Sequence, residues 1–141
     1  MKRKASARWE GNLKQGKGTI TLGSGVLKDT KYSFSTRFED SPGTNPEELI
    51  AAAHAGCFAM ALSAQLEAAG MTARRLDASA TVTLEKVGDG FAVTASHLVL
   101  AAKVPGADRE KFEKAVEAAK TGCPISKLLN AKITLDFSLE S

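Results

Sequence analysis

Two cysteines, Cys57 and Cys123, are the residues best suited to chemistry in this chain. The thiolate is the nucleophilic and redox-active form of cysteine, so the pKa of each thiol decides its reactivity. Cys123 precedes Pro124, and this order predicts an N-cap, where the helix dipole favours a thiolate. Cys57 lies among Ala, Gly and Phe, where burial should raise its pKa. Local physics therefore makes Cys123 the more reactive thiol, and Cys57 needs a cationic partner. Two inert buried thiols remain the alternative.

Arg37 and Glu47 could supply that partner. Arg37 is either a solvated surface residue or a source of positive charge for Cys57, and Glu47 is either a helix-dipole carboxylate or the anchor of Arg37 through a bidentate bond. Ten residues separate Glu47 from Cys57, which is about 15 Å along a straight helix. If they cooperate, either the helix is broken or Glu47 comes from a second chain, with two such helices antiparallel across a two-fold axis.

His54 precedes Cys57 by three residues and shares its helix face. A Cys–His nucleophile pair is conceivable, as is a zinc site that adds Cys123 and His97. For the Cys–His pair, no residue that could orient the histidine is evident. For the zinc site, only His54 and Cys57 have the short spacing that is typical of zinc ligands. Gly16-Lys17-Gly18 lies between predicted strands, so it is no phosphate loop. We expect no metal and no cofactor.

A long apolar helix should carry Cys57. Asn45 is suited to its N-cap and Pro46 to its first position, Glu47 and Glu48 complement its dipole, and Gly70 can end it. A helix this apolar is normally buried. Polar residues interrupt the run too often for a membrane span, namely Glu48, His54, Ser63, Gln65 and Glu67.

The remaining segments indicate an α+β fold in a single domain, residues 1–141. Strands are predicted at 5–10, 17–22, 31–38, 76–86, 91–104 and 132–139, and Gly88-Asp89-Gly90 marks a hairpin. In 31–38, alternation places Tyr32, Phe34, Thr36 and Phe38 on one face and Arg37 on the other. An amphipathic helix is predicted at 108–120, with the stripe Phe112, Ala115, Val116 and Ala119, and a helical turn at 125–129.

Composition narrows the classes of partner. A net charge of +3, one Trp and no basic run longer than Lys2-Arg3-Lys4 argue against nucleic-acid binding. No apolar region follows the basic start, so we expect no signal peptide, no membrane partner and a cytoplasmic location. In that reducing compartment a permanent structural disulfide is not expected.

Several motifs together resemble the OsmC branch of the OsmC/Ohr family. They are Thr36-Arg37-Phe38-Glu39, the run from Gly43 to Leu49, the segment Ala52-Ala53-His54-Ala55-Gly56-Cys57-Phe58, and Gly122-Cys123-Pro124-Ile125-Ser126. The similarity extends from Trp9-Glu10-Gly11 to the segment that begins at Lys132. The resemblance implies antiparallel sheets wrapped around a long central helix, in an intertwined homodimer with sites at the subunit interface.

The resemblance also implies a peroxidase that reduces organic hydroperoxides, and hydrogen peroxide less well, with an external dithiol such as a lipoyl-type reductant. Cys57 would be the peroxidatic thiol and Cys123 the resolving thiol, while Arg37 would stabilise the thiolate and Glu47 would hold Arg37. An apolar pocket around Phe58 and Met60 would favour organic substrates. A non-catalytic redox sensor, a small-ligand-binding dimer on the same scaffold and a purely structural dimer are the alternatives.

Overall fold

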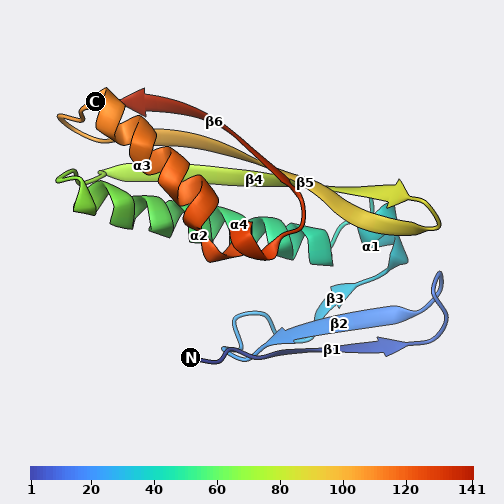
Figure 1. Cartoon of the computed structure of the whole chain (residues 1–141). Coiled ribbons are helices and arrows are strands. Elements are labelled where there is room, and N and C mark those ends of the chain that lie inside the picture. The colour runs from blue at the N-terminus through green and yellow to red at the C-terminus, as the bar shows by residue number, and fades with distance from the viewer. The chain divides into compact units, whose positions relative to one another are not determined.

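The computed structural model describes residues 1–141 and has the expected α+β composition (Figure 1). The chain divides into two compact units, residues 1–49 and residues 50–141, which are described in turn. A three-stranded sheet characterises each unit.

The first unit contains an antiparallel sheet in the order β1-β2-β3. Its strands are β1 (Ala5–Glu10), β2 (Lys17–Leu22) and β3 (Thr30–Tyr32), so the first two match the prediction. Gly18 lies between the rings of Trp9 and Tyr32, and a Cβ there would fall 2.4 Å from the Tyr32 ring. Gly18 is also the one buried residue of this unit, so its sheet has little core of its own within a single chain.

The segment that follows β3 corrects a prediction. Residues 34–38 form a short helix, α1 (Phe34–Phe38), rather than the second half of a strand. Ser33 accepts a hydrogen bond from the Thr36 backbone, and the Thr36 hydroxyl accepts one from the Ser33 backbone. This capping box outweighs the alternation of polar and apolar residues. Arg37 therefore lies in the last turn of a helix and not on the face of a strand.

The long helix is α2 (Pro46–Ala68), and it is unbroken. The Asn45 side chain accepts a hydrogen bond from the Glu48 N–H at 2.7 Å, which confirms the N-cap, and Gly70 adopts a positive φ of 79° just after the helix ends. Its buried stripe is His54, Phe58, Leu62 and Leu66. α2 is long and apolar enough to span a membrane. The core helix of a soluble protein can have the same length and composition. In α2, 22% of the most apolar 18-residue window is buried within the chain.

The sheet of the second unit has the order β4-β5-β6. It comprises β4 (Arg75–Val87), β5 (Gly90–Lys103) and β6 (Lys132–Glu140). The predicted hairpin joins β4 and β5, which are antiparallel. The β5–β6 pair is parallel, so this sheet is mixed and not wholly antiparallel as the resemblance implied. The reason lies in the long connection from Val104 to Ala131, which includes two helices and returns the chain in the same direction.

Those two helices are α3 (Arg109–Gly122) and α4 (Pro124–Leu128). The predicted stripe of α3 is buried in full. One core joins α2, β5 and α3, and its members are Phe58, Leu62, Leu66, Leu98, Leu100, Ala102, Val104, Phe112, Ala115, Val116 and Ala119. The packing of α2 and α3 against this sheet places α4, which follows α3 directly, beside the middle of α2.

Candidate active site

The two cysteines meet in the second unit. The thiol of Cys123 donates a hydrogen bond to the sulfur of Cys57, with the two sulfur atoms 2.7 Å apart. Cys57 comes from the middle of α2 and is partly exposed, whereas Cys123 is fully buried at the N-cap of α4. Both are free thiols. A pair in sulfur contact, with one member accessible, can pass between a dithiol and a disulfide without a large movement of the backbone.

Burial raises the pKa of the Cys57 thiol above its ordinary value, as the sequence predicted. The neighbouring Cys123 thiol acts in the same direction, whereas a hydrogen bond from the backbone N–H of Ile125 acts against both. Ile125 is the second residue of α4, and its N–H has no partner within that helix. The start of α4 therefore supplies Cys57 with a donor suited to a thiolate, but burial outweighs it.

The predicted N-cap position of Cys123 is confirmed. Its side chain makes no capping hydrogen bond, and its thiol faces Cys57 instead. The prediction that Cys123 is the more reactive thiol stays a prediction.

His54 does not contact the thiols through its ring nitrogens. Nδ1 lies 2.6 Å from the Ser96 hydroxyl on β5, and Nε2 lies 2.7 Å from the Ser126 hydroxyl on α4. Because both nitrogens are occupied, neither can activate Cys57 or bind zinc. His97, the other histidine of the zinc alternative, bonds to Thr134 and Asp136. The sequence reasoning missed Ser96 and Ser126; the one available signal was that Ser126 follows Cys123 by three residues, just as His54 precedes Cys57 by three.

Arg37 and Glu47 meet in the first unit, as the sequence suggested. Nε and Nη2 of Arg37 both donate to Oε1 of Glu47, at 2.9 and 2.7 Å, so the two bonds share one oxygen. Oε2 of Glu47 is buried and has no hydrogen-bond partner. The Asn45 amide also donates to the Thr36 carbonyl oxygen, which ties the start of α2 to α1. The guanidinium is thus held in place while its side chain remains 39% exposed, so it can still meet another molecule.

The expected pocket around Phe58 and Met60 is not formed within the chain. Phe58 is fully buried, whereas Met60 is 78% exposed. Two residues that are two positions apart on a helix point in nearly opposite directions, which is the reason for the difference.

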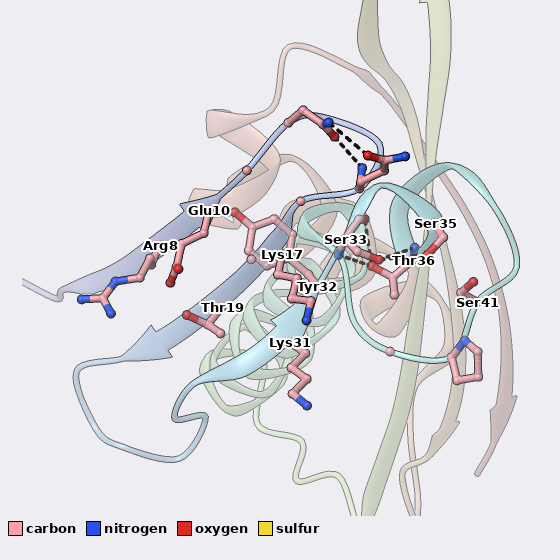
Figure 2. Close-up of a pocket in the computed structure, with 17 residues that line it drawn as sticks. Arg8, Glu10, Lys17, Thr19, Lys31, Tyr32, Ser33, Ser35, Thr36 and Ser41 are labelled. Atoms are coloured by element: carbon pink, nitrogen blue, oxygen red, sulfur yellow. Dashed lines mark hydrogen bonds between the residues drawn. The ribbon is translucent and has the colours of Figure 1, made fainter.

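A separate pocket of about 830 Å³ lies in the first unit (Figure 2). Residues between Arg8 and Gly43 line it, including Glu10, Lys17 and Lys31. Neither a cysteine nor a histidine is among them, so this pocket has no redox group of its own.

Comparisons with known proteins agree with these features. The family model described as OsmC-like protein matches residues 38–138. The chain is 52% identical to peroxiredoxin OsmC of Escherichia coli strain K12 over 139 residues, which is 99% of this chain and 97% of that protein. It is 28% identical to the organic hydroperoxide resistance protein OhrB of Bacillus subtilis strain 168, over 87% of this chain and 89% of that one.

Solved structures show the same fold. The crystal structure of OhrB from B. subtilis superposes with a TM-score of 0.72 at 30% identity and covers 98% of both chains. An OsmC-like protein of unknown function from Vibrio cholerae superposes with a TM-score of 0.78 at 17% identity, over 98% of this chain and 99% of that one. A family model that covers most of the chain, a close full-length relative and a shared fold lead to one conclusion: the chain belongs to the OsmC-like family.

Proposed function

We propose that this protein is a thiol-dependent peroxidase that reduces organic hydroperoxides to alcohols, and hydrogen peroxide less well, at the expense of a dithiol. The observation that carries the proposal is the contact between two free thiols, one buried and one partly exposed, at 2.7 Å. The names of the relatives, a peroxiredoxin and an organic hydroperoxide resistance protein, support it.

Cys57 is the peroxidatic residue in this proposal because it is the partly exposed cysteine of the pair, whereas Cys123 is buried. Its thiolate attacks the terminal peroxide oxygen, the O–O bond breaks, the alcohol leaves with a proton, and Cys57 becomes a sulfenic acid. The sulfur of Cys123 then displaces water from Cys57 and forms a disulfide. An external dithiol, of which lipoyl-type dithiols are the proposed example, reduces that disulfide through a mixed disulfide and becomes a disulfide itself.

Cys57 is partly exposed, but burial still raises the pKa of its thiol, so the thiol needs a nearby positive charge to ionise near neutral pH. Arg37, held by Glu47, is the proposed source. Because α2 is unbroken, the proposal assigns this pair to a second chain, so that Arg37 of the partner subunit stabilises the Cys57 thiolate and polarises the peroxide.

The second chain would form a homodimer with this one. Away from its buried stripe, α2 exposes Met60 and several small residues, Ala52, Ala53, Gly56 and Ala64. Small residues allow close approach of two helices, and an exposed apolar helix face of this length typically marks an interface. A second copy would also cover residues of the first unit, whose sheet has little core within one chain.

The two units would act together as one domain, residues 1–141, because α2 begins in the first and continues into the second. Two free thiols fit a protein that works in the cytoplasm, where an external dithiol is available. The proposal includes no nucleic acid or membrane.

The test is the consumption of cumene hydroperoxide, and of hydrogen peroxide, in the presence of a dithiol. Wild type should turn over many times, and with a higher kcat/KM for cumene hydroperoxide. Cys57→Ser should be inactive, and Cys123→Ser should react once and accumulate a sulfenic acid. Activity that survives in Cys57→Ser but not in Cys123→Ser would make Cys123 the nucleophile. A single oxidation of wild type without turnover would instead indicate a redox sensor.

A further inference from the structure

Two contacts, three residues apart, join α2 to α4. The Sγ atoms of Cys57 and Cys123 lie 2.7 Å apart, and Nε2 of His54 lies 2.7 Å from Oγ of Ser126. His54 comes three residues before Cys57 on α2, and Ser126 comes three residues after Cys123 on α4. Residues three apart share one helix face, so the two contacts form neighbouring links between antiparallel segments. The second link is a hydrogen bond between groups that are not redox-active.

His54 occupies a position where the rest of the stripe is apolar. Phe58, Leu62 and Leu66 follow it at intervals of four residues, and His54 is as fully buried as they are. A buried polar group without partners is destabilising, so an imidazole here needs both of its hydrogen bonds. A neutral imidazole has one N–H and one lone pair, so one serine hydroxyl accepts a hydrogen bond and the other donates one. With Ser96 fixed on β5, the orientation of the ring is determined and Nε2 points at α4.

α4 needs such an anchor. It has five residues, and a helix this short is not stable by itself in water. Two of its backbone hydrogen bonds run from Lys127 to Cys123 and from Leu129 to Ile125, both within the segment. Ser126 on α4 and Cys123 at its N-cap each make a side-chain hydrogen bond to α2. If α4 were to shift, both Cys123 and the N–H of Ile125 would move away from the sulfur of Cys57.

We propose that His54 is a positioning residue, which acts through Ser126 to hold α4 so that the sulfur of Cys123 stays within bonding distance of Cys57. Its effect falls on the step that forms the disulfide and not on the attack of Cys57 on an oxidant. In that step the sulfur of Cys123 bonds to the sulfur of Cys57, the leaving group departs with the electron pair of its bond to Cys57, and the proton of Cys123 goes to solvent. The inference deepens the proposed function, since this is its resolving step.

A reaction without peroxide tests it. The reduced protein is mixed with excess dithiodipyridine in a stopped-flow instrument. One cysteine opens the reagent to form a mixed disulfide and releases one thiopyridone; the other cysteine then attacks the mixed disulfide and releases a second. The absorbance of thiopyridone follows both releases. Cys123→Ser can release only the first thiopyridone, so the phase that is missing in this variant is the second. This measurement succeeds or fails whether or not the protein is a peroxidase, so it is independent of the proposed function.

Ser126→Ala should slow the second phase by about 3-fold to 10-fold, the factor that corresponds to the loss of one hydrogen bond, and leave the first phase unchanged. Ser96→Ala is the matched control. It leaves the other nitrogen of the same imidazole without a partner, but Ser96 lies on β5, which carries neither cysteine. Ser96→Ala loses the bond that orients the ring but keeps the direct bond between His54 and Ser126, so it should lower stability to a similar extent and slow the second phase less than Ser126→Ala does.

A double-mutant cycle with His54→Leu completes the test. The variant with both His54→Leu and Ser126→Ala should be no slower in the second phase than the slower single variant. Each substitution alone already removes the hydrogen bond between His54 and Ser126, so the second has no further bond to remove. The inference is wrong if Ser126→Ala and Ser96→Ala slow the second phase equally, if neither slows it, or if the effects of His54→Leu and Ser126→Ala simply multiply.

Discussion

The sulfur atoms of Cys57 and Cys123 lie 2.7 Å apart although 66 residues of sequence separate them. One sulfur comes from the middle of a long helix and the other from the N-cap of a short one. Neither helix alone could bring the two sulfur atoms together. The contact exists because α2 and α3 pack on the same sheet, and α4 follows α3 directly. The distance is close enough that oxidation requires only a small shift of the two side chains.

Oxidation should therefore stabilise the fold. A disulfide that closes a loop of 66 residues is expected to add about 4 kcal/mol to the free energy of unfolding. Urea unfolding of the diamide-oxidised and the reduced protein, at equal protein concentration, measures the difference. Cys123→Ser treated with diamide is the control and should show no gain. A bond that forms between chains instead, visible on a non-reducing gel, would contradict the intramolecular contact.

Arg37 should set the ionisation of Cys57. In a Cys123→Ser background, Arg37→Met should move the pH midpoint of Cys57 alkylation by iodoacetamide upward by about one unit, because a nearby positive charge lowers a thiol pKa and burial raises it. Arg37→Lys keeps the charge but loses the paired bonds to Glu47, so its midpoint should lie between the two. Identical midpoints in all three proteins would remove Arg37 from the site.

Acid should weaken the fold through His54. Burial lowers the pKa of His54 below its ordinary value of 6.5, and its hydrogen-bond partners are two serines that cannot balance an imidazolium charge. The unfolded chain therefore binds a proton at pH values where the folded chain does not. Stability is fully present above pH 6.5 and falls as the pH drops from there toward the lowered pKa.

Urea unfolding at about pH 7.5 and about pH 5.5 should show that the free energy of unfolding falls further in wild type than in His54→Leu over this interval. The comparison between the two proteins isolates His54, because every other residue is the same in both. An equal loss in both would mean that His54 takes up its proton normally in the folded state.

The exposed face of α2 should mediate dimerisation. Met60→Glu would place a charge in an apolar interface, so it should dissociate the dimer and, with it, reduce peroxidase activity. Sedimentation equilibrium reports the mass of each variant. Val26→Glu adds the same charge at an equally exposed apolar residue outside α2 and is the control. A monomeric wild type, or a Met60→Glu variant that remains dimeric, would contradict the proposed interface.

Most elements could be predicted from the sequence because their signals are local. Asn45 and Pro46 mark the start of α2, and the stripe of α3 has an unambiguous helical period. The segment 34–38 could not, since its alternation is typical of a strand while a capping box of Ser33 and Thr36 makes it a helix. Five residues are too few for the helical period to be visible.

The sequence indicated the candidate residues of the proposed site but not the residues that support them. The chemistry of Cys57, Cys123, Arg37 and Glu47 is intrinsic to the residue types, so the sequence indicated them. Ser96 and Ser126 carry no such signal: they matter because β5 and α4 bring them to the two nitrogens of one imidazole. The parallel pairing of β6 with β5 is likewise a property of the whole connection between them and not of any residue pattern.

That parallel pairing has a consequence for biosynthesis. The β4–β5 hairpin can form as soon as it leaves the ribosome, but β6 must return beside β5 before the connection that holds Cys123 is fixed at both ends. Cys57 therefore emerges long before its partner can be presented to it. In a nascent chain the fold does not yet hold Cys123 against Cys57, so the native contact between the two thiols depends on the pairing of β6 with β5.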